Sequence, residues 1–183
     1  MADYKTFEFN AGKFKDLLLY ICERLSDDPT FGETKLNKTL FFSDFKAFRV
    51  LGTSITGADY QKNRYGPTAR LYTVMRDELL SADQLRVELR PVVDHVQDVL
   101  SPHNIKPNLV QFTKDELAIV DGVIEEMRQY TNTQVSDLSH EKAAGWVAHD
   151  LGETIPYETA LISMDPVDEQ VIAYFDVLEP LSA

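Results

Sequence analysis

The apolar residues between positions 35 and 51 recur at the spacing of an amphipathic helix. On a helical wheel, in which successive residues are about 100° apart, one side carries Leu36, Leu40, Phe41, Ala47, Phe48 and Leu51. Gly52 follows at the position where helices typically end. Residues 55–67 end in a Tyr65-Gly66-Pro67 turn and predict a short extended ribbon, after which Pro67 can open a further helix at its first position. The pattern therefore predicts a central helix followed by a ribbon.

Two more helices are predicted in the N-terminal half of the chain. Asn10 can cap the first, because its side chain can accept a hydrogen bond from the first helical turn, and Ser26–Pro29 end it. Its inward positions are Phe14, Leu17, Leu18, Ile21, Cys22 and Leu25. Residues 4–9 either pair as a short strand or pack as an arm. The helix that begins at Pro67 is predicted to stop near Ser81, with Leu71, Val74, Met75 and Leu79 inward.

The middle of the chain changes from an alternating to a helical pattern. Residues 84–100 alternate in places and are rich in valine, which favours one or two short strands in a small hairpin or flap. Thr113 and Glu116 then stand at the spacing of a capping box, with the apolar Phe112 just ahead of them. The helix that they open is expected to turn inward Leu117, Val120, Ile124 and Met127.

Shorter elements are predicted in the C-terminal part. Thr133 is expected to cap a helix that ends at Ser139-His140, and a second short helix then runs through Trp146. Residues 155–162 are predicted to be extended, and Asp165-Pro166 to cap a terminal helix whose inward positions are Val167, Val171, Tyr174, Phe175 and Leu178. The expected fold is mainly α: one compact domain over residues 1–183, built as a bundle of about six to seven helices with a short β-hairpin or ribbon.

Two polar residues, Asn37 and Asp44, project from the apolar side of the central helix. An unpaired amide or carboxylate there would cost several kcal/mol, so each needs a partner. One interpretation is that Asp44 accepts hydrogen bonds from the ribbon, with Tyr60, Lys62 or backbone N–H groups as donors. The alternative is a polar pocket in which Asp44 lies with Asn37, Tyr65 and His140.

The opposite side of the central helix combines cations with aromatic rings: Lys35, Lys38, Phe42, Phe45, Lys46 and Arg49. If other helices cover the two rings, the cations only extend to solvent. If they do not, this side is a partner surface in which the rings supply contact area and the cations fix the register on an acidic patch. Arg64, Arg70 and Tyr65 could extend that surface, although Tyr65 fits a core position as well.

Two groups of residues resemble a known family. The first, within residues 35–67, contains Lys35-Leu36-Asn37-Lys38, Leu40-Phe41-Phe42, Asp44, Gly52, Thr56-Gly57 and Tyr65-Gly66-Pro67. The second, within residues 133–163, contains Asp137-Leu138-Ser139-His140 and Trp146. Together they resemble the Panacea domain of SocA-like antitoxins, a family that includes phage-associated proteins. The likeness spans residues 10–163 and departs from the family pattern in the polar segment 83–111, a possible flap where partner specificity can vary.

The resemblance implies a compact, mostly helical domain that binds and neutralises toxin proteins, with one type that instead delivers its toxin to a protease. Composition is compatible with such a role. The chain has 183 residues and a net charge of −12, which argues against a nucleic-acid or anionic-membrane binder. The single cysteine, Cys22, leaves no disulfide framework, and no targeting sequence or long apolar stretch is present, so the cytoplasm is the expected location.

The sequence contains no recognisable catalytic or metal-binding motif. There is no glycine-rich phosphate loop and no paired-histidine spacing, so neither a cofactor nor a metal is expected. His140 is interpreted as a hydrogen-bonding residue at a helix junction, or else as a contact to a partner or substrate. Trp146 is interpreted as a core residue whose indole N–H needs an acceptor. Gly66 is expected to allow a close approach or a backbone angle that other residues cannot adopt.

Three functions remain open at this level. The first is an antitoxin that masks a cognate toxin, encoded by the adjacent gene, through direct protein–protein contact. The second is a proteolytic adaptor that delivers the toxin to a protease. The third is an enzyme that uses Asp44, Tyr65 and His140 as acid–base groups, which would require their side chains to converge in one pocket. The sequence defines neither the toxin nor the oligomeric state.

Overall fold

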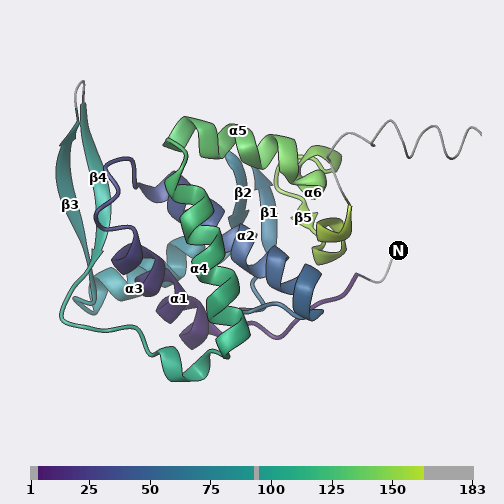
Figure 1. The fold of residues 1–183 in the computed structure, drawn as a ribbon, viewed down its shortest axis with the longest axis horizontal. Helices are drawn as coiled ribbons and strands as arrows, with labels where there is room; N and C mark the ends of the chain where they lie inside the picture. Colours follow the sequence, from purple (N-terminus) through teal and green to yellow (C-terminus); the bar gives the residue numbers. More distant parts are fainter. Residues whose placement is uncertain (1–3, 93–94, 163–183) are drawn as a thin grey trace, which may run out of the picture.

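The computed structural model describes residues 4–92 and 95–162 (Figure 1). Its helices are α1 (Ala11–Arg24), α2 (Glu33–Leu51), α3 (Tyr72–Ser81), α4 (Lys114–Arg128), α5 (Asn132–Lys142) and α6 (Ala144–Ala148). Its strands are β1 (Tyr60–Asn63), β2 (Gly66–Ala69), β3 (Leu85–Val92), β4 (His95–Pro102) and β5 (Thr154–Ile155). Two 3₁₀ turns, η1 (Leu109–Gln111) and η2 (Tyr157–Leu161), complete the described elements.

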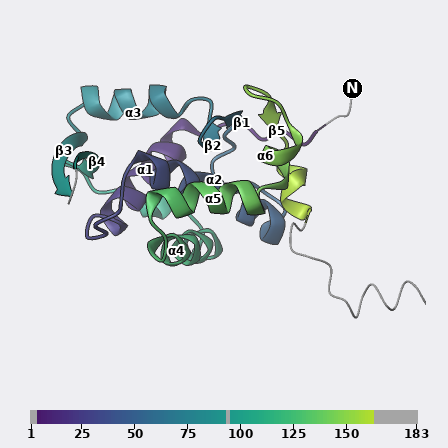
Figure 2. The ribbon, with the colours of Figure 1, turned by 90° about the horizontal axis from the view of Figure 1, so that it is seen from above.

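Helix α2 is the centre of the fold. It packs against α1, α4, α5, β2 and η2, which together enclose most of its circumference. Figure 2 shows α3 along one side of the molecule and α4 along the opposite side, with α1 and α2 between them. A helix enclosed in this way buries more than one stripe, and this has consequences for the charged side chains on α2.

Local signals define several helix ends as predicted. The Asn10 side chain accepts a hydrogen bond from Lys13 N at 2.9 Å and caps α1. Gly52 ends α2 in the left-handed conformation, at φ 73°. The predicted capping box of α4 is confirmed, since Thr113 and Glu116 each bond the other's backbone N–H. All six inward positions predicted for α1 are buried.

Other element boundaries differ from the predictions. The cap of α5 is Thr131, which forms a capping box with Gln134, and the prediction of Thr133 as the cap is wrong. Helix α5 also continues through Ser139-His140 to Lys142, so the change of direction falls at Ala143. Because Thr131 and Thr133 lie two residues apart in one polar run, sequence preference alone does not separate them.

The start of α3 was also misplaced. Pro67 lies in β2, so α3 begins at Tyr72, and Leu71 and Val74 are exposed rather than inward. Strand β2 tolerates Pro67 because it is an edge strand, in which a missing N–H breaks no ladder. The predicted inward positions Met75 and Leu79 are buried.

The prediction of a helical bundle with only a short ribbon is wrong, because the structure contains two sheets in addition to its helices. Strand β1 pairs with β2 and with β5, both antiparallel, in the order β2-β1-β5. Strands β3 and β4 form a separate hairpin of eight-residue strands, which projects at one end of the molecule (Figure 1). The bundle prediction missed β5 because it is two residues long and joins the ribbon from far along the chain.

The core joins the N-terminal arm, the helices and the three-stranded sheet. Residues 4–10 have no regular structure; Phe7 and Phe9 pack on the core, and Asn10 N donates to Thr56 O at 2.9 Å. Around the C-terminal half of α2, rings from distant segments meet, among them Phe45 stacked on Tyr157 with centroids 4.7 Å apart. Residues 157–161 form a 3₁₀ turn rather than the extended segment predicted. The predicted terminal helix lies outside the described residues.

No helix within residues 4–92 and 95–162 has both the length and the apolarity needed to cross a bilayer.

Candidate functional site

Asp44 anchors the loop that leads from α2 into the three-stranded sheet. Its side chain is fully buried, and its Oδ1 accepts hydrogen bonds from Ser54 Oγ, Ile55 N and Thr56 N at 2.8–2.9 Å. Its Oδ2 accepts from Thr56 Oγ1 at 2.5 Å and from Tyr60 Oη at 2.8 Å. The predicted bond from Tyr60 is present, whereas Lys62 is not among the donors.

Burial raises the pKa of Asp44, and the hydrogen bonds from Thr56, Tyr60 and Ser54 act in the opposite direction. Tyr157 completes the enclosure, since its hydroxyl donates to Ala58 O at 2.6 Å and lies 3.0 Å from Ser54 Oγ. No local pattern in the sequence connects this tyrosine, 113 positions after Asp44, with the loop. Every oxygen of Asp44 is committed to holding backbone and side chains in place.

The alternative polar pocket of Asn37, Asp44, Tyr65 and His140, three of which were the candidate acid–base groups of an enzyme, does not form as a hydrogen-bonded unit. Tyr65 is 66% exposed, which also makes its assignment to the core wrong. Asn37 Nδ2 donates to Glu33 O of its own helix at 3.0 Å. The His140 ring stacks on Trp146 with centroids 3.8 Å apart. In the described part of the chain no hydrogen bond connects any two of these four side chains.

The two groups of family-like residues meet at Gly66. This glycine has φ +103°, and a Cβ at its position would lie 2.5 Å from Lys38 Nζ and 2.6 Å from Ser139 Oγ. Lys38 Nζ donates to Pro67 O at 3.3 Å, and burial lowers the pKa of Lys38 to about 8. Gly66 thus allows β2 to approach both α2 and α5, as expected for a glycine at a close contact.

Trp146 closes the other side of this junction. The side chain of Trp146 is partly exposed rather than buried in the core as predicted. Its indole N–H donates to Asn63 O at 3.0 Å, and Lys62 Nζ lies 4.4 Å from the centroid of its ring. Burial and the neighbouring Lys38 lower the pKa of His140. Asn63, Trp146 and His140 therefore connect the sheet to α5 and α6, as a structural junction would.

The predicted basic and aromatic side of α2 is divided by the fold. Lys35 is fully buried, with its Nζ 2.5 Å from Asp28 Oδ2, and Lys38 is 2% exposed. The expectation that these two lysines face solvent is wrong, because Asp28 and Thr30 of the α1–α2 loop bind Lys35 and Pro67 of β2 binds Lys38. Phe45 is buried as well, against Tyr157. A single helical wheel treats one side as uniform, whereas the neighbours of α2 change along its length.

The C-terminal half of α2 keeps its cations at the surface, where they border a groove of about 440 Å³. In Figure 1 this end of α2 lies between α4 and η2. The basic residues of the groove are Lys46, Arg49 and Lys142, and Glu126 also lines it. Its apolar lining includes Phe41, Phe42, Phe45, Val50, Val123, Ala143, Ala144, Ala160 and Ile162. We call this feature the basic groove.

The basic groove contains four of the eight residues predicted to bind a partner: Phe42, Phe45, Lys46 and Arg49. Arg64 and Tyr65 are exposed in the β1–β2 turn, with the guanidinium 5.6 Å from the tyrosine ring centroid, and do not line the groove. Contributions from α4, α5 and η2 were missed, because only the folded chain brings residues 123–162 beside α2.

No group of three or more histidine, cysteine or acidic residues within the described ranges is arranged to hold a metal ion. Cys22, the one cysteine of the sequence, is buried, and burial raises the pKa of its thiol. The basic groove combines exposed cations, which can pair with carboxylates, with an apolar floor.

Comparison with known proteins gave one finding. Residues 36–147 match the family model described as "Antitoxin SocA-like, Panacea domain". The match extends from the first turn of α2 to α6, and so includes the Asp44 loop, the Gly66 junction and most of the basic groove. No curated protein and no solved structure matches the chain.

Proposed function

The chain belongs to the family of SocA-like antitoxins with a Panacea domain, and from this premise we propose that it neutralises a cognate toxin by direct protein–protein contact. In this proposal residues 1–183 act as one domain in the cytoplasm, and the toxin is the product of the adjacent gene. Neutralisation by masking needs no cofactor and no chemical step. In this proposal Asp44 has a structural role, because both of its carboxylate oxygens accept hydrogen bonds from the loop after α2 and from Tyr60.

The observation that carries the proposal is the placement of Lys46, Arg49 and Lys142 around an apolar groove in a chain of net charge −12. Exposed cations beside half-buried Phe42 form a small positive area in an acidic protein. Such an area favours an acidic segment of the partner, because complementary charge increases the association rate and fixes orientation. Apolar side chains of the partner would fill the floor, where most binding energy is usually concentrated.

The interface proposed here is smaller than the one expected from the sequence. Lys35 and Lys38 are buried and cannot contact a partner without unfolding part of α2, so they are left out. Phe45 contributes to the groove floor through the small part of its ring that remains accessible. Arg64 and Tyr65 form a separate exposed point, which could add a second contact to a large toxin.

The test is the double substitution Lys46→Glu with Arg49→Glu. It places like charges opposite the proposed acidic segment, which can cost several kcal/mol of binding free energy. We expect the variant to lose growth rescue of cells that express the toxin, and to lose co-purification with it. Both residues are exposed, so the free energy of unfolding should change by no more than about 0.5 kcal/mol each.

A matched control is Arg86→Glu with Lys114→Glu, which changes the net charge equally at exposed residues that do not line the groove. This control should rescue growth like the wild-type chain. If the groove variant folds, by circular dichroism, and still rescues and co-purifies, the groove is not the interface.

Measuring toxin abundance in the same cells separates masking from delivery to a protease. Masking leaves the amount of toxin unchanged while its activity is blocked. A fall in toxin abundance that disappears in a protease-deficient strain would instead favour the adaptor function.

A further inference from the structure

The segment that follows the basic groove has the opposite charge. Residues 163–183 contain five acidic side chains, at positions 165, 168, 169, 176 and 179, and no lysine or arginine. Apolar residues recur among them at helical spacing: Val167, Val171, Tyr174, Phe175 and Leu178. An acidic, amphipathic sequence of this kind is complementary to an apolar groove with basic residues at its border.

The basic groove offers such a surface and lies where this segment begins. Ile162, the last described residue, is part of the groove lining and is 56% exposed. Val50 and Leu161 nearby are each 62% exposed. The groove therefore presents uncovered apolar area within a few residues of the start of the acidic segment.

Two of the three cations of the groove have no acidic partner in the described part of the chain. Among residues 4–92 and 95–162, no carboxylate lies within 4.0 Å of Lys46 or Arg49, and Lys142 is 3.8 Å from Glu126. By contrast, Lys13, Lys15, Arg24 and Arg76 elsewhere on the surface each have an acidic side chain within 2.6 Å. The groove is thus a positive area that its described neighbours leave mostly uncompensated.

We propose that the chain's own residues 163–183 dock in the basic groove, with their apolar positions on the floor and their carboxylates near Lys46, Arg49 and Lys142. Because the segment is tethered at Ile162, its effective concentration at the groove is on the order of millimolar, so even a weak contact is well populated. This docking does not depend on the proposed function. If the toxin also binds in the groove, the acidic segment of the toxin must first displace residues 163–183.

The test cross-links two introduced cysteines in the full-length chain with a short bis-maleimide. One cysteine replaces Val50 at the groove. The other replaces Gln170, which is neither apolar nor charged, so that no proposed contact is removed. Cys22 can stay in place, since it is fully buried and shielded from the reagent.

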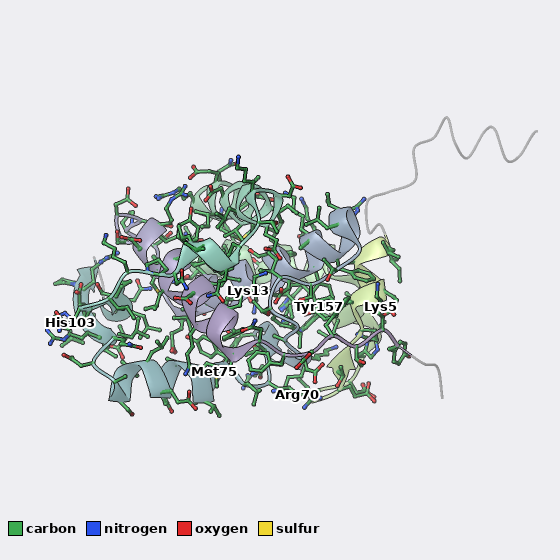
Figure 3. All side chains as sticks on the ribbon, turned by 90° about the horizontal axis from the view of Figure 1, so that it is seen from below. Lys5, Lys13, Arg70, Met75, His103 and Tyr157 are labelled. Atoms are coloured by element: carbon green, nitrogen blue, oxygen red, sulfur yellow. The ribbon has the colours of Figure 1, made fainter. Side chains whose placement is uncertain are left out.

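The control pair is Leu89→Cys with Gln170→Cys. Leu89 is 72% exposed in β3, and Figure 1 shows the β3–β4 hairpin at the end of the molecule opposite η2. Figure 3 likewise places His103, just after β4, at the far end from Tyr157 in η2. Because position 170 is only eight residues from the tether at Ile162, the Leu89 pair reports the background rate far from the groove. Docking itself is tested by the charge substitutions at Lys46 and Arg49.

We expect intramolecular cross-linking of the Val50 pair to be at least about tenfold faster than that of the Leu89 pair. Adding Lys46→Glu and Arg49→Glu should lower the Val50 rate, whereas Arg86→Glu with Lys114→Glu should leave it unchanged. Equal rates for the two pairs, or a Val50 rate that ignores the groove substitutions, would overturn the proposal.

Cross-linked dimers in place of cross-linked monomers would also overturn it, since the segment would then occupy the groove of a second copy. The measurement uses purified protein without toxin, so its outcome is separate from that of the growth-rescue test. Docking can fail while rescue still depends on the groove, and the reverse is equally possible.

Discussion

At the scale of single residues, Asp44 shows how a buried carboxylate can organise a loop. Its two oxygens accept five hydrogen bonds, two of them from successive backbone N–H groups at Ile55 and Thr56. The loop between α2 and β1 has no regular structure, so these bonds satisfy donors that a helix or sheet would otherwise satisfy. Loss of the carboxylate should therefore be felt along the whole loop.

Asp44→Ala is predicted to lower the free energy of unfolding by at least about 3 kcal/mol, because it leaves several buried donors without an acceptor. Chemical denaturation would measure the change. Ser43→Ala is the matched control: Ser43 is also fully buried on α2, but its hydroxyl has no hydrogen-bond partner within the described residues. Ser43→Ala should change the free energy of unfolding by no more than about 1 kcal/mol. Comparable losses for the two variants would refute the role given to Asp44.

Lys38 is a second residue-scale case, with the opposite balance. Its ammonium group is buried with no carboxylate partner among residues 4–92 and 95–162, and burial lowers its pKa from 10.5 to about 8. Between pH 8 and 10.5 the unfolded chain thus binds more protons at this residue than the folded chain does. The contribution of Lys38 to stability consequently rises with pH across this window and is constant on either side of it.

Lys38→Met is predicted to stabilise the fold at pH 7 by up to about 3 kcal/mol, the free energy equivalent to the pKa shift. The substitution removes the buried charge and keeps a side chain of similar length. The difference in unfolding free energy between variant and wild type should shrink as the pH rises from 8 to 10.5. Because both proteins contain the same tyrosines, the pH dependence that tyrosine ionisation adds to stability cancels in this difference. A difference that stays constant over this range would show that Lys38 is not desolvated.

At the scale of helices and strands, local signals predicted what depends on neighbours in sequence. Asn10, Gly52 and the Thr113–Glu116 box each act within one helical turn, and all three were correctly placed. Strand β5 and the edge position of β2 depend on pairing across the chain. No periodicity in the local sequence reveals such pairing. For this reason the sequence predicts a helix start at Pro67, whereas Pro67 lies in the edge strand β2.

The cap of α5 gives an element-scale prediction. Thr131 accepts from Gln134 N, and Gln134 Oε1 accepts from Thr131 N at 2.8 Å, while Thr133 lies inside the first turn. Thr131→Ala should lower the melting temperature, with a loss of about 1 kcal/mol in unfolding free energy. Thr133→Ala should be within about 0.5 kcal/mol of the wild type, and the reverse order would restore the boundary expected from the sequence.

At the scale of the whole molecule, the candidate site follows from what surrounds α2. The sequence identified the cations and rings of this helix, because composition and periodicity are local properties. It did not reveal that the α1–α2 loop and β2 bind Lys35 and Lys38, or that α4, α5 and η2 complete a groove beside Lys46 and Arg49. The family likeness was predicted from two separated blocks, which the fold unites at Gly66.

The central claim is that the basic groove holds the toxin, and the dissociation constant of the purified pair tests it most directly. Isothermal titration would compare the wild-type chain, Lys46→Glu/Arg49→Glu, and the control Arg86→Glu/Lys114→Glu. We predict that the groove variant binds at least about 100-fold more weakly, as expected when charge pairing at an interface becomes repulsion, while the control binds like the wild type. A folded groove variant with the wild-type dissociation constant would contradict the account.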